Sequence, residues 1–223
     1  GAFFVGSDTI ALAADPSNAV IRYTLDGSNP GPSSPAYTGP ITLKKTTALK
    51  ARAYSKEIPE TNLFAMTFTK LEPVAPAANP GALSPGIRCD LYTGAWDVLP
   101  DFTKLTPVKT AVARTIAFPQ GVPADRFGLR FTGFIDIPKD GAYTFYSASD
   151  DGSRIYIGDR LVVDNDGLHG PDEVSGGIAL LAGKHPITVV FFEKEGGEAL
   201  TVQYDGPGIV KQAIPAERLF VKE

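Results

Sequence analysis

The sequence predicts an all-β protein made of two domains, and three observations lead to that prediction. Its 223 residues include 23 glycines and 19 prolines, spread among short apolar runs as turns are spread between strands. No segment keeps the apolar period of a helix. Residues 72–85 form a proline-bearing stretch with the composition of a linker, and the net charge is +2 over residues 1–71 but −6 over residues 72–223. We therefore expect one domain at 1–71, a linker at 72–85 and a second domain at 86–223.

The first domain contains several short runs with the two-residue alternation of half-buried strands. The clearest is residues 47–54, in which Lys50 and Arg52 fall on the solvated face. Asp26-Gly27 is a turn signal. Further strands are expected at residues 9–13, 19–24 and 64–68. Four short strands in about 70 residues indicate a small immunoglobulin-like sandwich.

The second domain is longer and contains more strand candidates. Turn signals at residues 139–141, 150–152 and 158–159 separate apolar runs. We expect strands at residues 127–137, 142–146, 153–157, 160–163, 178–181, 187–193 and 199–204. Regularly spaced strands of this kind predict a β-sandwich or a jelly-roll-like barrel.

Composition excludes several classes of function. The net charge is −4 and the longest basic run is Lys44-Lys45, so we expect no nucleic-acid partner. No stretch approaches the roughly 18 apolar residues that span a membrane, which predicts no membrane insertion. Cys89 is the only cysteine, which excludes a disulfide within the chain and a cysteine-based zinc site.

Three segments of the first domain carry a family resemblance. They are residues 21–30 (Ile-Arg-Tyr-Thr-Leu-Asp-Gly-Ser-Asn-Pro), 37–41 (Tyr-Thr-Gly-Pro-Ile) and 47–53 (Thr-Ala-Leu-Lys-Ala-Arg-Ala). Together they resemble the chitobiase/β-hexosaminidase C-terminal domain. The resemblance implies a small β-sandwich found beside glycoside hydrolase domains, with no catalytic residues of its own.

The second domain resembles the PA14 domain over about residues 86–223. The matching segments include 131–135 (Phe-Thr-Gly-Phe-Ile), 141–145 (Gly-Ala-Tyr-Thr-Phe), 149–157 (Ser-Asp-Asp-Gly-Ser-Arg-Ile-Tyr-Ile), 163–167 (Val-Asp-Asn-Asp-Gly) and 181–187 (Leu-Ala-Gly-Lys-His-Pro-Ile). This resemblance implies a PA14 β-sandwich or barrel.

Asp150 and Asp151 form the most distinctive polar feature. Adjacent aspartates converge only where the backbone turns sharply, and they then offer up to four hard oxygens of the kind that Ca²⁺ prefers. The resemblance implies more: in lectin-like PA14 members a cis peptide bond joins the equivalent pair, which holds a calcium ion that contacts sugar hydroxyls. The alternative is an ordinary turn, which Asp and Gly also favour.

A second acidic loop follows at Asp164, Asn165 and Asp166. It lacks the distal glutamate of an EF-hand, but it could share a cation with Asp150 and Asp151 or line the same pocket. A plain hairpin loop is the alternative. Lectin-like PA14 members use an asparagine from a later loop as a ligand, and Asn165 is the only asparagine after the linker, a departure from the fungal adhesins.

Three other side chains have two interpretations each. His169 could donate a hydrogen bond to a sugar hydroxyl, or it could be an ordinary exposed histidine. Trp96 could stack on a sugar ring, but packing within the domain is favoured. Tyr156 lies in a predicted strand and is expected in the core.

Nothing in the sequence indicates catalysis. Glycosidases need two carboxylates about 5–10 Å apart, a separation that adjacent aspartates control poorly, and the known hydrolase and phosphate-loop motifs are missing. We therefore expect a non-catalytic accessory region of a secreted, periplasmic or cell-surface bacterial protein. Its expected partners are a glycan and an upstream catalytic domain, such as a β-N-acetylhexosaminidase. The alternative is a structural or adhesive module that binds no sugar.

Overall fold

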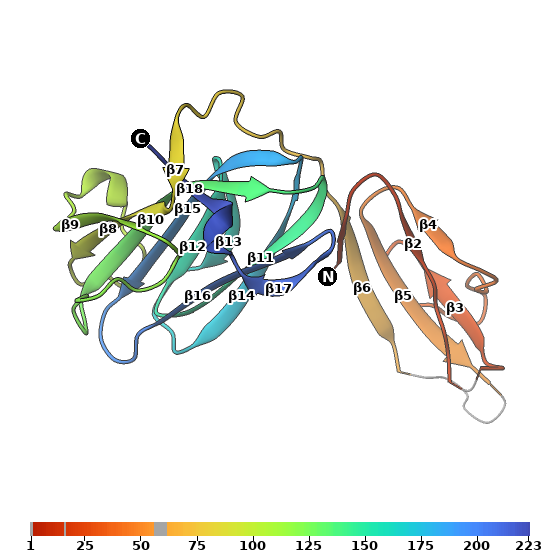
Figure 1. The fold of residues 1–223 in the computed structure, drawn as a ribbon. Helices are drawn as coiled ribbons and strands as arrows, with labels where there is room; N and C mark the ends of the chain where they lie inside the picture. The colour runs from red at the N-terminus through yellow and green to blue at the C-terminus, as the bar shows by residue number, and fades with distance from the viewer. Residues whose placement is uncertain (1, 16, 56–61) are drawn as a thin grey trace. The chain divides into compact units, whose positions relative to one another are not determined.

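The chain folds into two compact units, Gly1–Glu72 and Pro73–Glu223. They are seen in a computed structural model that describes residues 2–15, 17–55 and 62–223 (Figure 1). The described residues form strands and two short 3-10 helices, which confirms the all-β prediction. None of these helices is long and apolar enough to cross a bilayer.

The first unit contains a four-stranded sheet, in the order β1-β6-β5-β3, and a two-stranded sheet of β2 and β4. Its strands are β1 (Ala2–Phe4), β2 (Asp8–Ile10), β3 (Val20–Thr24), β4 (Ile41–Leu43), β5 (Thr47–Tyr54) and β6 (Phe64–Lys70). Alternation along β5 points Leu49 into the unit, where it contacts Leu43 and Phe68. This alternation fixes the register, because a one-residue slip would turn Leu49 out to solvent.

The second unit is built on a larger sheet in the order β13-β12-β15-β10-β18-β7, with β8 paired to β10 and β9 to β8. These strands are β7 (Leu83–Pro85), β8 (Ile87–Thr93), β9 (Lys109–Ala113), β10 (Phe127–Ile137), β12 (Ser153–Ile157), β13 (Arg160–Asn165), β15 (Gly183–Glu193) and β18 (Leu219–Lys222). The long β10 and β15 pair along their whole length, from Phe127 opposite Glu193 to Ile137 opposite Gly183. They form the centre of the sheet.

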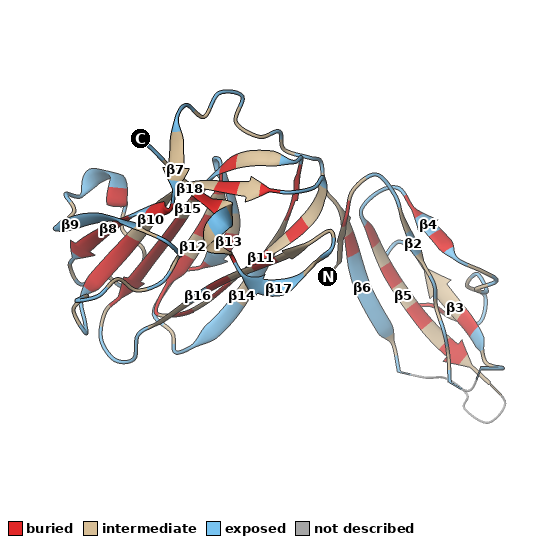
Figure 2. Cartoon of the chain, in the orientation of Figure 1, coloured by how far each residue is buried: buried red, intermediate tan, exposed pale blue. Residues whose placement is uncertain are grey.

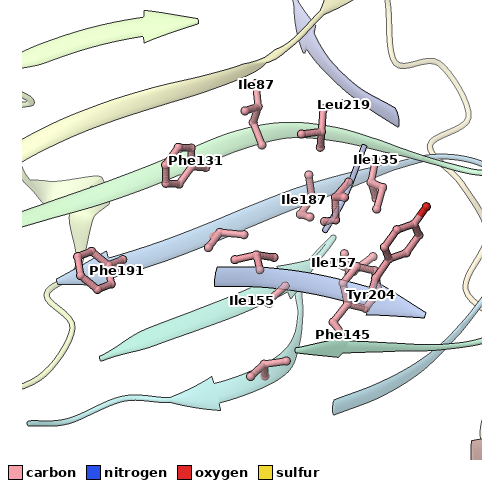
Figure 3. Packing of buried hydrophobic residues seen from close by; sticks show 14 of the residues in the cluster. Ile87, Phe131, Ile135, Phe145, Ile155, Ile157, Ile187, Phe191, Tyr204 and Leu219 are labelled. Carbon is pink, nitrogen blue, oxygen red and sulfur yellow. The ribbon is translucent and has the colours of Figure 1, made fainter. Parts of the chain in front are cut away.

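A second, four-stranded sheet covers one face of the larger one, in the order β14-β11-β16-β17. Its strands are β11 (Gly141–Asp150), β14 (Asp172–Leu180), β16 (Ala199–Gly206) and β17 (Ile209–Ala213); the 3-10 helices are η1 (Phe102–Lys104) and η2 (Ala216–Arg218). The core lies between the two sheets, and Phe131, Phe145 and Tyr204 are almost fully buried there (Figures 2 and 3). Two sheets packed face to face make this unit a β-sandwich.

Residues 72–85, expected to be a linker, are largely hydrogen-bonded to the second unit. The Val74 N–H donates to the Ala179 carbonyl, and the Val74 carbonyl accepts from the Leu181 N–H. Further along, the Ala77 N–H donates to the Lys184 carbonyl, and β7 pairs with β18. The break between the units lies between residues 72 and 73, so most of this proline-bearing stretch belongs to the second unit.

Candidate functional site: a cluster of three carboxylates

The candidate site lies at the end of β11, where the inward-facing side chains change from apolar to polar. Tyr143 and Phe145 fill the core, and Ser147 and Ser149 follow on the same face, all four almost fully buried. Asp151 follows directly after the last residue of the strand and is 6% exposed. A carboxylate therefore lies at the end of the core.

A buried hydroxyl network lies beneath this carboxylate. The Ser153 hydroxyl is 2.7 Å from that of Ser147 and 2.8 Å from that of Ser149. The Asn165 side-chain amide donates to Ser149 Oγ at 3.1 Å and to the Asp172 carbonyl at 3.2 Å. Because polar groups buried without partners cost about 1–3 kcal/mol each, this satisfied network fixes the floor of the site.

The peptide bond between Asp150 and Asp151 is cis. Two backbone N–H groups hold the Asp151 carboxylate: His169 donates to Oδ1 at 3.2 Å and Lys194 to Oδ2 at 3.0 Å. Within the described part of the chain, no hydrogen bond or ion pair engages the half-buried Asp150 carboxylate. Asp151 is thus anchored between two loops, and Asp150 remains available to a ligand.

Glu193 completes the cluster from the end of β15. Alternation along that strand places it on the inner face after Ile187, Val189 and Phe191, and it is fully buried. Its Oε2 accepts the Asp151 N–H at 3.1 Å, whereas its Oε1 is buried and has no hydrogen-bond partner among the described residues. Burial, together with the charges of Asp151 and Asp150, raises the pKa of Glu193 to about 7. A deprotonated Glu193 therefore needs a positive partner.

The three carboxylates have the spacing of ligands to a single cation. One oxygen from each of Asp150, Asp151 and Glu193 lies within 4.8 Å of the other two. Two oxygens bound to one Ca²⁺ are at most about 5 Å apart, because each lies about 2.3–2.6 Å from the ion. Among the described residues, no lysine or arginine forms an ion pair with these three groups. The unpartnered Glu193 Oε1 fits a bound cation.

The second acidic loop does not join this cluster. Asp164 is exposed, and its Oδ1 accepts from Arg154 Nε at 2.7 Å. The Asp166 carboxylate accepts from the Leu99 N–H at 2.7 Å and pairs with Arg154 at 3.2 Å. Asn165 belongs to the hydroxyl network described above. The three residues shape the loop beside the cluster, and none of their side chains is among the clustered oxygens.

His169 reaches the site through its backbone. Its ring nitrogens lie 2.9 Å from the Gly170 carbonyl and 3.1 Å from the Asn165 carbonyl. Burial lowers the pKa of His169, but the two carbonyl contacts and the Asp151 charge outweigh this effect and raise it overall. Because carbonyls only accept, the imidazolium form satisfies both contacts. Through these contacts the His169 ring stabilises its own loop, in which the His169 backbone N–H points at the Asp151 carboxylate.

Trp96 packs rather than standing free, with its ring edge-on to Phe102 at 5.9 Å. Glu193 was not among the site residues predicted from the sequence. An available signal was that the alternation of residues 187, 189 and 191 continues to an acidic residue at 193, on a face that is otherwise apolar.

Residues 89–218 match the PA14 domain, and residues 1–65 match the chitobiase/beta-hexosaminidase C-terminal domain. The chain belongs to the PA14 family. The two domains occur in the order that the sequence predicted, and both resemblances are confirmed. The carboxylate cluster lies within the PA14 domain.

Relatives of the chain include an anti-sigma factor. The anti-sigma-I factor RsgI3 of Acetivibrio thermocellus is 26% identical over 102 residues, which are 45% of this chain and 16% of that protein. An anti-sigma factor domain-containing protein of known structure is 20% identical, with a TM-score of 0.55 over 91% of this chain and 76% of that one. The PA14 sugar-binding domain from an RTX adhesin is 16% identical, with a TM-score of 0.54 over 62% of this chain and 99% of that one.

Proposed function

We propose that the chain is a non-catalytic, carbohydrate-binding accessory region whose PA14 domain binds glycan at the carboxylate cluster with the help of a calcium ion. The observation that carries the proposal is the cluster of Asp150, Asp151 and Glu193, in which one buried oxygen has no partner within the described part of the chain. The sugar-binding PA14 domain of the RTX adhesin supports the choice of ligand.

In this proposal Asp150, Asp151 and Glu193 hold the ion. A bound Ca²⁺ commonly takes six to eight oxygens, so three carboxylates leave positions for sugar hydroxyls. The Lys194 N–H and the His169 N–H keep the Asp151 carboxylate oriented. The loop after β15 passes close above Asp150, because a Cβ on Gly197 would lie 3.6 Å from its Oδ2. A glycan reaching the site would meet this loop.

Calcium binding is tested by thermal unfolding with EDTA and with added CaCl₂. We expect calcium to raise the melting temperature of the PA14 domain, as a ligand of the folded state does. Asp150→Asn should remove that increase. Asp159→Asn, at an exposed hairpin turn, is the matched control and should retain it. If calcium raised the melting temperature of the Asp150→Asn variant as much as that of the wild type, the cluster would not be the calcium site.

Glycan binding is tested separately on a glycan array, with and without calcium. Binding that requires calcium and is lost in Asp150→Asn supports the proposal. Absence of binding in both conditions would leave the structural or adhesive module as the better interpretation. Turnover of aryl glycosides by the purified chain would contradict the non-catalytic part of the proposal.

Two kinds of full-length protein are compatible with this pair of domains, and each is favoured by a different observation. The hexosaminidase-type first domain favours a place in a secreted or cell-surface glycoside hydrolase, where glycan binding would raise the local concentration of a catalytic domain. The similarity to an anti-sigma factor domain-containing protein across 91% of the chain favours a place in an anti-sigma factor. The coding sequence that flanks this chain distinguishes them: a hydrolase domain supports the first, and an anti-sigma domain supports the second.

A further inference from the structure

A cavity of about 350 Å³ opens on the outer face of the larger sheet, which we call the outer-face cavity. Its lining comes from β10, β12 and β15 and from the segment 99–103. Arg130 of β10 points into it, because its neighbours Leu129 and Phe131 are fully buried on the opposite face. Asp151 and Glu193 are buried on the core side, so this cavity is separate from the carboxylate cluster.

Much of the cavity lining is apolar or aromatic. Val190 and Phe102 are buried in a small cluster, and Leu99 and Tyr156 pack against it. Tyr156 was expected in the core, but it faces outward from β12, between the inward-facing Ile155 and Ile157. Aromatic and apolar walls with a few polar groups are typical of small-ligand sites. Such walls suit the C–H face of a sugar ring.

Arg130 brings an uncompensated positive charge to this lining. Among the described residues, no carboxylate lies within ion-pair distance of it, and its guanidinium neighbours the Tyr92 hydroxyl. Burial raises the pKa of Tyr92, so that neighbour is neutral. Asp90, directly opposite on β8, is already bonded to Arg88 at 2.9 Å and to Thr110 at 2.6 Å.

The other charged groups of the lining are paired. Arg154 contacts Asp164 at 2.7 Å and Asp166 at 3.2 Å. Asp101 contacts Lys104 at 3.0 Å at the rim. Arg130 is therefore the group of this lining that would gain most from a carboxylate, which a guanidinium binds through two parallel hydrogen bonds.

We propose that the outer-face cavity binds a carboxylate-bearing sugar, the uronate residue of a polysaccharide. The uronate carboxylate would pair with the Arg130 guanidinium, and the sugar ring would pack against the Tyr156 side chain. The volume is near the lower end of the range for ligand pockets, about 300–1,000 Å³, which suits a sugar residue rather than a long oligosaccharide. Residues 72–223 carry a net charge of −6, which opposes a dense polyanion. A polymer with sparse uronates is the better match. The proposal shares with the proposed function only the assumption that the ligand is a saccharide.

The test is an amide chemical-shift titration of the whole chain with methyl glucuronide and methyl glucoside as probes, first in EDTA and then with added CaCl₂. We expect millimolar binding of the glucuronide, with shifts at Arg130, Tyr156 and Thr188 and little response to the glucoside. Since the contact is ionic, raising NaCl should weaken it. Shifts that require calcium and centre on Asp150 and Asp151 would assign the ligand to the carboxylate cluster and overturn the proposal.

Variants separate the two sites. Arg130→Gln should weaken glucuronide binding at least tenfold, whereas Arg160→Gln, at an exposed hairpin, is the matched control and should have no effect. Asp150→Asn, which removes the proposed calcium ligand, should leave glucuronide binding intact. Equal binding by Arg130→Gln and the wild type, or equal binding of glucuronide and glucoside, would overturn the proposal.

Discussion

Replacing Glu193 by glutamine should stabilise the calcium-free PA14 domain at alkaline pH. The pKa of this buried carboxyl is raised from 4.5 to about 7, so the folded state holds a proton that the unfolded state releases between those values. The stability of the wild type therefore falls as the pH rises from 4.5 to 7. Because each pKa unit corresponds to about 1.4 kcal/mol, the loss is roughly 3 kcal/mol at pH 8.

The variant should not show this loss, because glutamine carries no charge and retains an oxygen for the Asp151 N–H. A domain of this size changes its melting temperature by about 2–4 °C per kcal/mol. In EDTA at pH 8 we therefore expect the variant to melt roughly 6–12 °C above the wild type, with a much smaller difference at pH 5. Added calcium should reverse the order, because the variant lacks one of the proposed ligands.

Differential scanning calorimetry at both pH values measures these differences. Glu195→Gln is the matched control, because Glu195 is exposed and pairs with Arg126, and it should change the stability by less than about 1 kcal/mol. Other groups that titrate in this range, such as His169, are common to variant and wild type, so their contribution largely cancels. Equal melting temperatures for Glu193→Gln and wild type at pH 8 in EDTA would refute the assignment of a charged, unpartnered Glu193.

Three further changes test the packing within the two domains. Gly176→Ala should severely destabilise the PA14 domain in urea unfolding, because the new Cβ would lie 1.6 Å from the Val162 carbonyl oxygen; unchanged stability would contradict this packing. Ser153→Ala should cost about 1–3 kcal/mol by leaving buried hydroxyls unpaired, and a neutral result would mean that the network is not stabilising. Leu49→Ala should cost about 2–5 kcal/mol and lower only the first domain's calorimetric transition; a matching loss in the second transition would show that the two unfold together.

Local alternation was sufficient to predict the strands with one buried and one solvated face. Residues 47–54 and 127–137 correspond to β5 and β10 with the same bounds. Strand β8 was missed although Ile87, Cys89 and Leu91 alternate with the charged Arg88 and Asp90, so the two-residue pattern was present in the sequence. The start of β14 was missed because its polar, glycine-containing first half becomes a strand only by pairing with β11.

In the candidate site too, neighbours in the sequence could be predicted, whereas contacts between distant segments could not. Asp150 and Asp151 are adjacent, so the sequence could propose them together. Glu193 meets Asp151 across 42 residues, through the packing of β15 beside β12, and no local motif encodes that contact. Asp164 and Asp166 were expected to share a cation or a pocket with the aspartate pair, but both carboxylates pair with Arg154.

Residues 73–85 determine where a fragment must begin if it is to contain the complete PA14 domain. The family match begins at residue 89, but a fragment cut there would leave the backbone of β18 without its β7 partner and the Ala179 carbonyl without Val74. Bare strand edges invite pairing with other chains. The portable unit therefore begins at residue 73, and gene fusions or recombination events joined at that point would transfer a domain with its edge already protected.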